Sequence, residues 1–503
     1  MAITPSTPGA IDTPNTLTAD PIGEVAIPNT LTADAVGAIA IPNTLNAEAV
    51  GAVAIPNTLN AEAYGAIAVP NTLTADAVGV VAAPNVLAPQ APSAFPRTIC
   101  PLVSLDFASQ LYAQCGSPVA FDDLFAYSRA SSATFINRTP KCTAGYDYFV
   151  DTVLDDTLRF EYDPETGENL GALIEGSSTN LALYSEEFDN AAWTKTATTI
   201  NTNTGVAPDK TSSMDEIEVS SAAATQGIST NSFTADGGSS YTFSIYILKS
   251  LSNFDVALYY RSPISGSTQY AILVFNPATG VVSTAPSNFK LVDFGDYYKV
   301  EITEPSLPAG AMRAHIRLSN MAIGSKVGAW GAQLEALPFA SSYIRTEGSA
   351  VSRSADNLSL PSAGNFNASE FTLFADVKFN GSGVKVYNAF SVSDGTTNNR
   401  LQVRESSLSK LNLVYQSNGT LYANTQGANI PKETTGVTVT YDGISVSTYL
   451  DGSFGLSSSA VPLENENIIV LGNLPLTSDY LYGHISKFAS YDINLTAQEV
   501  SLL

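Results

Sequence analysis

The chain has 503 residues, of which 44% are hydrophobic and only 14% are charged, and 47 acidic against 23 basic side chains give a formal net charge of −24. A surface this acidic repels phosphate backbones, so nucleic-acid binding is not expected. The sequence contains no run of about 18 apolar residues that could span a membrane, and its start, MAITPSTPGAIDTPN, lacks the basic and apolar regions of a signal peptide. The length predicts three or four domains, and abundant Ser, Thr, Gly and Asn favour an all-β fold.

Residues 1–97 repeat a 14-residue unit. Within a unit such as 37–50, Gly and Ile alternate with Ala, which is the period-2 pattern of a short strand. A proline then ends the strand, because it has no amide donor. Since both faces of such a strand are apolar, one unit cannot cover itself and needs neighbours. The Pro-Asn pairs that mark the proposed particle-docking repeats begin at Pro14, Pro28, Pro42, Pro56, Pro70 and Pro84.

Two ordered arrangements of these repeats remain open. They resemble the triple β-spiral shafts of trimeric viral fibres, in which three chains bury one another's apolar faces. Alternatively, each unit docks on one of several identical subunits, and the tethered copies add weak contacts into a firm anchor. Disorder in the free chain is a third possibility, although disordered tracts are usually richer in charge. Residues 1–96 contain no Lys, Arg or His, so catalysis is not expected there.

The following segment, 98–175, is predicted to be a connector module. Its stretches LVSLDFASQ, YSRASSATFINR and DPETGE resemble a module of bacteriophage fibre and head-spike proteins that precedes a carbohydrate-binding-like jelly roll. The resemblance continues through GAWGAQLEALPFASSYIRTEGSAVSRSADNLSL (328–360) and covers roughly residues 102–503. It implies a virion surface protein that is made in the host cytoplasm, is extracellular after release, and has phage capsid or tail proteins as partners.

Residues 176–350 are predicted to form the jelly roll, an antiparallel β-sandwich. The stretch YTFSIYI (241–247) alternates as a half-buried strand does, and further short strands follow at similar spacing. Consecutive tyrosines on a strand point to opposite faces, so one residue of each Tyr pair should face away from the core. Trp193 and Trp330 are interpreted as core residues or as sugar platforms. The glycan-binding candidates are Tyr259, Tyr260, Tyr297, Tyr298 and Trp330.

Residues 351–503 resemble a laminin-G or concanavalin-like lectin sandwich. The stretches FTLFADVKF (371–379) and VTVTYDGISVSTYLDG (437–452) carry that resemblance. The Asp-Gly pairs inside the second stretch predict two hairpin turns. Thr496 and Glu499 have the spacing of a capping box, which predicts a short terminal helix.

No enzyme activity is predicted. The two histidines, His315 and His484, fall on different predicted sandwiches, and no nucleophile motif accompanies either. Glycosidases need only two carboxylates, but the β-helix repeats that usually frame them in depolymerases are absent from the sequence. We therefore assign no catalytic residue.

No cofactor or metal site is assigned either. Glu186, Glu187 and Asp189, with Glu335, are the carboxylates best placed in sequence to hold a structural calcium ion, although solvated carboxylates explain them as well. Three cysteines without CxxC spacing are expected to be buried free thiols. They are Cys100, Cys115 and Cys142.

These observations predict a homotrimeric bacteriophage fibre or spike. Its repeats would anchor it to the particle, and its two sandwiches would bind host-surface glycan, each contact weak and the sum durable. The alternatives are a structural capsid decoration without a host ligand and, third, a glycan hydrolase.

Overall fold

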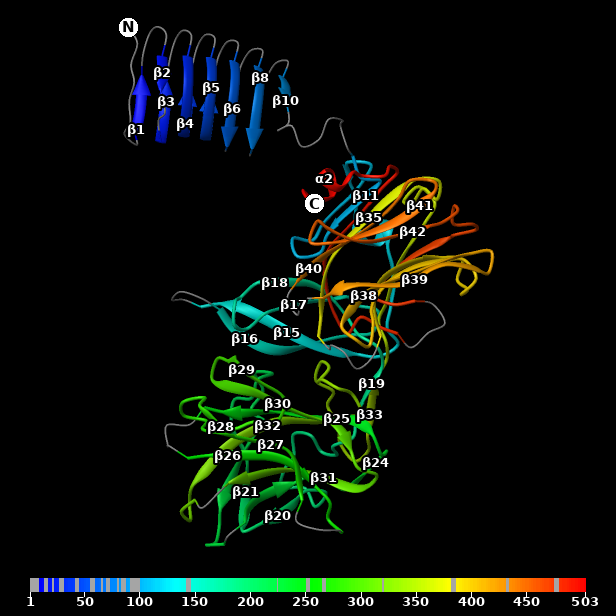
Figure 1. Ribbon diagram of the computed structural model, residues 1–503. Helices are drawn as coiled ribbons and strands as arrows, with labels where there is room; N and C mark the ends of the chain where they lie inside the picture. The colour runs from blue at the N-terminus through cyan, green and yellow to red at the C-terminus, as the bar shows by residue number, and fades with distance from the viewer. Residues whose placement is uncertain are drawn as a thin grey trace. The chain divides into compact units, whose positions relative to one another are not determined.

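The computed structural model describes residues 100–503 apart from short gaps, and before residue 100 it describes the backbone of the repeat strands (Figure 1). The gaps are 142–145, 224, 250–253, 265–267, 319–320, 381–385, 431–433 and 475–478. Residues 100–501 form one compact unit, and residues 1–99 form another, which is described by itself. The described elements are almost all strands, which confirms the predicted all-β class.

In the repeat unit, each strand residue pairs in parallel with the residue 14 positions later. Leu31 pairs with Leu45, Leu45 with Leu59, and Leu59 with Leu73. Successive units of one chain therefore supply each other's strand edges, which neither the three-chain shaft nor the docking array anticipates. The six prolines of the Pro-Asn pairs lie outside the described residues. The strands are β1 (Gly9–Asp12), β2 (Leu17–Ala19), β3 (Ile22–Ala26), β4 (Leu31–Ala40), β5 (Leu45–Ala54), β6 (Leu59–Tyr64), β7 (Ile67–Ala68), β8 (Leu73–Val78), β9 (Val81–Ala82) and β10 (Leu87–Gln90).

The second unit contains two β-sandwiches, and the larger one is built mainly from the C-terminal residues. One of its sheets has the order β13-β12-β11-β44-β35-β40-β41-β42, with β17 and β18 attached to β44. These strands are β11 (Val103–Asp106), β12 (Leu111–Gln114), β13 (Ser117–Pro118), β17 (Arg159–Tyr162), β18 (Asn169–Ile174), β35 (Phe371–Phe379), β40 (Thr435–Tyr441), β41 (Ser445–Leu450), β42 (Ser453–Ser459) and β44 (Gly483–Tyr491).

The facing sheet of this sandwich has the order β14-β34-β43-β36-β37-β38-β39. These strands are β14 (Ala126–Ser128), β34 (Asn357–Pro361), β36 (Tyr387–Ser393), β37 (Arg400–Glu405), β38 (Lys410–Ser417), β39 (Thr420–Asn429) and β43 (Ile468–Leu471). The predicted hairpin turns lie at Gly443 and Gly452, whose φ angles of 91° and 71° favour glycine. Helix α2 (Ala497–Val500) begins with the predicted capping box of Thr496 and Glu499.

The connector segment supplies strands to both sheets of this sandwich. Val103 of β11 pairs with Ser490 of β44, and Ala172 of β18 pairs with Ile485 of the same strand. Figure 1 shows β11 in cyan beside strands near the red end of the chain. The connector also holds the short helix α1 (Phe121–Leu124). The jelly roll is thus an insertion between early and late strands of one lectin-like sandwich, and the two parts of that sandwich share one core.

The inserted jelly roll, with an inner core of its own, consists of two antiparallel sheets. The inner-facing side chains of 241–247, as predicted, are Tyr241, Phe243, Ile245 and Ile247. The expectation of a half-buried strand is wrong, because every residue of 241–247 is buried. One sheet contains β20 (Thr194–Thr196), β23 (Gln226–Ser229), β24 (Phe233–Ala235), β26 (Val256–Arg261), β27 (Gln269–Phe275), β28 (Val282–Thr284) and β31 (Gly310–Leu318). The other contains β21 (Thr198–Gly205), β22 (Met214–Val219), β25 (Ser239–Leu248), β29 (Asn288–Phe294), β30 (Tyr297–Leu307) and β32 (Lys326–Glu335).

Two short pairs of strands complete this unit. The hairpin of β15 (Ala133–Pro140) and β16 (Tyr146–Val153) comes from the connector and packs on the outer face of the sheet that contains β32. Strands β19 (Ser178–Asn180) and β33 (Val351–Arg353) pair where the chain enters and leaves the jelly roll. Among the described residues, no helix is long and apolar enough to cross a membrane.

A buried network of charges lies where the connector, the jelly-roll ends and the lectin strands meet. Arg159 contacts Glu175 at 2.8 Å and Asp356 at 2.5 Å. Arg129 also contacts Asp356, at 3.2 Å, and Arg353 contacts Glu175 at 3.4 Å. Burial by itself would raise the pKa of Glu175, but Arg353 and Arg159 lower it to about 2. The sequence stretches that carry the family resemblance therefore supply charges that hold the junction together.

Candidate functional site

The tyrosine pairs alternate across their strands as predicted. Tyr260 lies in the core of the jelly roll and Tyr298 packs against that core, whereas Tyr259 and Tyr297 face outward. However, Tyr259 is only 2% exposed and Tyr297 only 5%, and Tyr260 is fully buried. The prediction that outward tyrosines offer an exposed sugar platform is therefore wrong for these residues.

Side chains from other elements cover the outward tyrosines. The ring of Tyr259 stacks on that of His315, with centroids 4.8 Å apart and an interplanar angle of 4°. Tyr297 belongs to a cluster with Val150 of the β15–β16 hairpin, and its hydroxyl donates to the carbonyl of Val206 at 2.6 Å. Alternation along a strand predicts the direction of a side chain. It does not predict burial by the β15–β16 hairpin, which lies far away in the sequence.

Both tryptophans are core residues. Trp330 is 1% exposed, packs against Tyr246 and Tyr343, and donates its Nε1 hydrogen to Ser213 Oγ at 2.9 Å. Trp193 is 2% exposed, meets Phe188 edge to face, and donates to two backbone carbonyls. Trp330 as a glycan-binding residue is therefore a wrong prediction, because the β15–β16 hairpin covers the face on which it lies.

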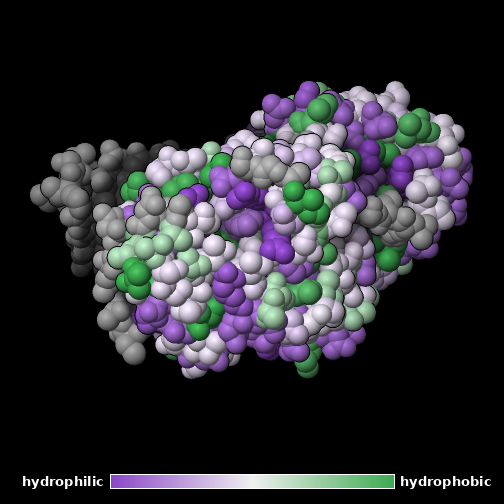
Figure 2. All heavy atoms as spheres, turned by 90° about the horizontal axis from the view of Figure 1, so that it is seen from below, coloured by the Kyte–Doolittle hydropathy of each residue, from purple (hydrophilic) through white to green (hydrophobic). Residues whose placement is uncertain are grey.

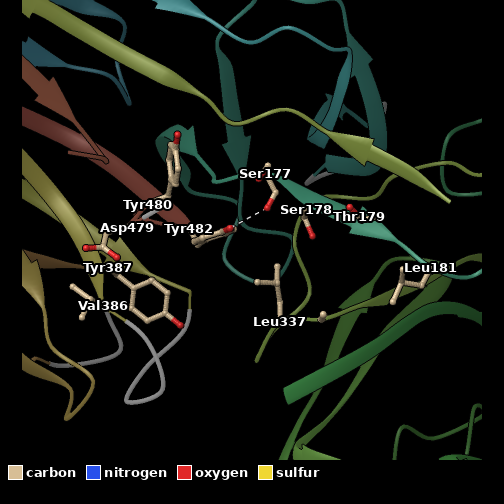
Figure 3. Close-up of a pocket in the computed structure, with 11 residues that line it drawn as sticks. Ser177, Ser178, Thr179, Leu181, Leu337, Val386, Tyr387, Asp479, Tyr480 and Tyr482 are labelled. Carbon is tan, nitrogen blue, oxygen red and sulfur yellow. Dashed lines mark hydrogen bonds between the residues drawn. The ribbon is translucent and has the colours of Figure 1, made fainter. Parts of the chain in front are cut away.

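A pocket of about 520 Å³ lies where the lectin-like sandwich meets the segments that lead into and out of the jelly roll (Figure 3). Its size falls in the range of small-molecule sites. One side is formed by 177–181 and 336–337, and the other by 386–387 and 479–482. Because its walls come from four separate segments, no local sequence pattern points to it.

Three tyrosines give the pocket an aromatic wall. The rings of Tyr387 and Tyr480 each stand edge-on to that of Tyr482, with centroids 6.4 Å apart in both pairs. The Tyr482 hydroxyl donates to the carbonyl of Ser177 at 3.1 Å, as the dashed line in Figure 3 shows. Tyr482 is thus held by two ring contacts and a hydrogen bond, and Tyr480, which is only partly buried, is among the residues that line the pocket.

Residues with polar groups also line the same pocket. The hydroxyl oxygen of Tyr387 is buried and has no hydrogen-bond partner among the described residues. Burial raises the pKa of the Asp479 carboxyl, whereas the charges of Arg404 and Arg400 act to lower it. Asn388 donates to the backbone carbonyl of Asp479 at 2.7 Å and so fixes the position of that residue. An aromatic wall beside a few hydroxyl and carboxyl groups is suited to a sugar ring, whose faces are apolar and whose edges carry hydroxyls.

A second pocket, of about 470 Å³, is lined by ionisable groups that lie in pairs. Glu161 Oε2 lies 2.8 Å from Nε2 of His484, and Lys299 lies 3.1 Å from Glu301. Asp163, the first residue of DPETGE, accepts hydrogen bonds from two backbone amides of its own turn and lies 3.5 Å from Lys378. His484 is on β44 and His315 on β31, so the structure keeps the two histidines on separate sandwiches.

The structure does not bring the candidate calcium ligands together. Glu335 is buried and accepts hydrogen bonds from Ser178 and Ser341, each at 2.5 Å. Glu186 instead accepts from Tyr343 and pairs with Arg345. Across the described part of the chain, no three His, Cys, Asp or Glu side chains are placed to hold a metal ion. A calcium site shared by Glu186, Glu187, Asp189 and Glu335 is therefore a wrong interpretation.

The cysteine prediction is also corrected. Cys100 and Cys115 are free, but both are exposed instead of buried. They flank the β11–β12 hairpin, which lies at the edge of its sheet and so offers them little cover. Cys142 lies outside the described residues.

Comparison with known proteins identifies one part of the chain. Residues 352–501 match the Concanavalin A-like lectin/glucanases superfamily, in its Laminin_G_3 branch, as the resemblance of the C-terminal segment implied. No curated protein matches the chain. The matched segment contains the strands that form most of the larger sandwich, so that sandwich is lectin-like in sequence as well as in architecture.

Several solved structures are similar to part of the chain at low identity. The CBM40 module of the Ruminococcus gnavus IT-sialidase, bound to alpha2,3 sialyllactose, has 12% identity and a TM-score of 0.24, over 27% of this chain and 82% of that one. Domain 4 of AbnA, a GH43 extracellular arabinanase from Geobacillus stearothermophilus, has 16% identity and a TM-score of 0.24, over 32% and 80%. The NanB sialidase from Streptococcus pneumoniae has 13% identity and a TM-score of 0.24, and the match spans only 26% of its length. Similarities at this level assign no ligand to this chain.

Proposed function

We propose that this chain is a non-catalytic glycan-binding adhesin, and that the pocket around Tyr387, Tyr480 and Tyr482 receives a sugar unit. The observation that carries the proposal is that three tyrosines, one with a buried hydroxyl that has no partner among the described residues, and Asp479 line one pocket of a lectin-like sandwich. A tyrosine ring covers one face of a sugar, while Asp479 and the Tyr387 hydroxyl bond to its edge.

We further propose that the adhesin is a bacteriophage fibre or spike on the virion surface. The support is the sequence resemblance of the connector and jelly-roll stretches to such proteins, and in this proposal the N-terminal repeat region acts as the particle anchor. A homotrimer suits this role, because each site binds at roughly millimolar strength, about −4 kcal/mol, and several sites on one particle multiply the effect.

Binding of neutral oligosaccharides and of host-surface polysaccharide to the full-length chain tests the pocket. Replacing Tyr480 by Ala should weaken binding about tenfold, the equivalent of about 1.4 kcal/mol, because the ring that closes the wall is removed. Phe454→Ala is the matched control, since Phe454 is an aromatic residue of the same sandwich that is 62% exposed and lies outside the pocket. Equal binding by the two variants, or no retention on any host polysaccharide, would favour the decoration role instead.

The virion role has a separate test. Sedimentation of the full-length chain should give a trimer of the 52.8 kDa protomer, and a chain that begins at Arg97 should still bind glycan but fail to enter particles. Normal incorporation of that shortened chain would contradict the anchor, and a monomer in sedimentation would contradict the trimer.

A further inference from the structure

The jelly roll carries a group of arginines on the outer face of the sheet that contains β26 and β31. On β31, Met312, Ala314 and Ile316 point into the core, so the alternate residues, Arg313, His315 and Arg317, point outward. This sheet lies opposite the one covered by the β15–β16 hairpin. The arginines are partly exposed.

Strand pairing places the outward residues directly beside those of β26. Arg261 lies opposite Arg313, and Tyr259 lies opposite His315. Arg317, two positions further along β31, flanks the stacked Tyr259–His315 pair on its other side. Three cationic side chains thus surround two flat rings that pack face to face.

Two arginines of this face, Arg261 and Arg313, differ from other cations of the chain in their surroundings. Lys249, Lys299 and Lys326 each lie within 3.2 Å of a carboxylate. In the part of the chain that the structure describes, neither Arg261 nor Arg313 forms an ion pair, and Arg313 donates instead to the hydroxyl of Thr194 at 2.6 Å. Burial, and then Arg261 and Arg313, lower the pKa of His315 to about 4, so the ring is neutral at physiological pH.

Placing these arginines beside one another lowers the stability of the folded sheet. Like charges directly opposite on neighbouring strands are destabilising, and a chain with 47 acidic residues had many ways to neutralise them. Guanidinium groups bind carboxylates and phosphates through paired hydrogen bonds. The uncompensated charge therefore indicates an anionic ligand.

We propose that this face is a second saccharide site, which binds the acidic groups of an anionic cell-surface glycan. The chemistry shared by the candidate ligands is a carboxylate or phosphate on a sugar polymer. A nucleic acid carries phosphates as well, and the binding experiment below therefore includes it as a competing ligand. Figure 2 shows a face of the molecule on which hydrophilic, intermediate and hydrophobic residues are interspersed.

Binding of four probes to the full-length chain tests the site: an oligogalacturonate for the carboxylate, a glycerol-phosphate teichoic acid for the phosphate, neutral dextran, and duplex DNA. The variant is the pair Arg261→Gln and Arg313→Gln. Its matched control is Lys290→Gln with Lys326→Gln, which removes the same charge from the other sheet of the jelly roll. Far-UV circular dichroism checks that both variants fold, and Arg261→Lys with Arg313→Lys keeps the charge while losing the planar fork.

We expect the arginine pair to lose at least tenfold in affinity for one acidic saccharide, the control pair to lose less than twofold, and the Lys variant to fall between them. The carboxylate and phosphate arms then identify which acid is bound. Equal losses in both Gln pairs, or tightest binding to DNA or dextran, would overturn the proposal. Because Tyr480→Ala leaves this face intact, failure here and failure of the aromatic pocket are separate results.

Discussion

Two groups of arginines in this chain differ in burial and in whether a carboxylate lies beside them. Arg129, Arg159 and Arg353 are buried, and each contacts Glu175 or Asp356. Arg261 and Arg313 lie opposite each other on a sheet surface, and neither has a carboxylate partner among the described residues. A buried charge must be compensated inside the fold, whereas a partly exposed one can be left for a ligand. The comparison separates cations that hold the structure together from cations available for binding.

The largest expected effect comes from breaking the buried group. Replacing Asp356 by Asn keeps the shape but removes the charge that faces Arg129 and Arg159. We expect a loss of about 3–5 kcal/mol in the free energy of unfolding, the usual result of leaving buried charges unpaired, measured by urea denaturation. Asp293→Asn is the control, because its partner Lys249 is partly exposed and such pairs contribute about 1 kcal/mol or less. Similar losses of unfolding free energy in the two variants would show that Asp356 does not compensate the buried charges of Arg129 and Arg159.

Acid should reduce the contribution of the buried charge network to stability over a defined range of pH. The pKa of Glu175 is lowered from 4.5 to about 2, so its contribution is complete above pH 4.5 and is lost as the pH falls toward 2. That shift corresponds to about 3 kcal/mol, and Glu175→Gln should remove this part of the pH dependence of unfolding. Glu335 provides a control of opposite sign. Burial raises its pKa, so its contribution to stability increases as the pH falls. An unchanged acid profile in Glu175→Gln would contradict the assignment.

The smallest effect is expected on the exposed group, and it has the opposite sign. Arg261→Gln relieves the repulsion from Arg313, so the free energy of unfolding should rise by about 0.2–1 kcal/mol while binding of the acidic saccharide falls. Thermal unfolding with and without the saccharide measures both. A variant that loses stability would mean that Arg261 supports the sheet, and the distinction between the two groups would disappear.

Much of the local structure could be predicted from sequence. Alternation at 241–247 identified the core residues of β25, and the spacing of Thr496 and Glu499 identified the cap of α2. The repeat period of 14 residues also equals the pairing offset of the parallel strands. These features depend on residues close together in the sequence, or on a strict repeat, and so the sequence alone predicts them.

The candidate site could not be predicted in the same way. Alternation showed that Tyr297 points away from the core, but it could not show that Val150, about 150 positions earlier, belongs to the hairpin that covers it. The pocket at Tyr387 and Tyr480 requires the jelly-roll ends to meet loops of the other sandwich.

By itself, the sequence determined the strand content, the inward or outward direction of most side chains, the hairpin turns and the excess of negative charge. Only the tertiary structure decided that the connector completes the lectin-like sandwich, that Trp330 is covered, and that Arg261 meets Arg313 on one face. The physical reason is that direction depends on the geometry of one strand, whereas burial and charge compensation depend on which distant segments pack together.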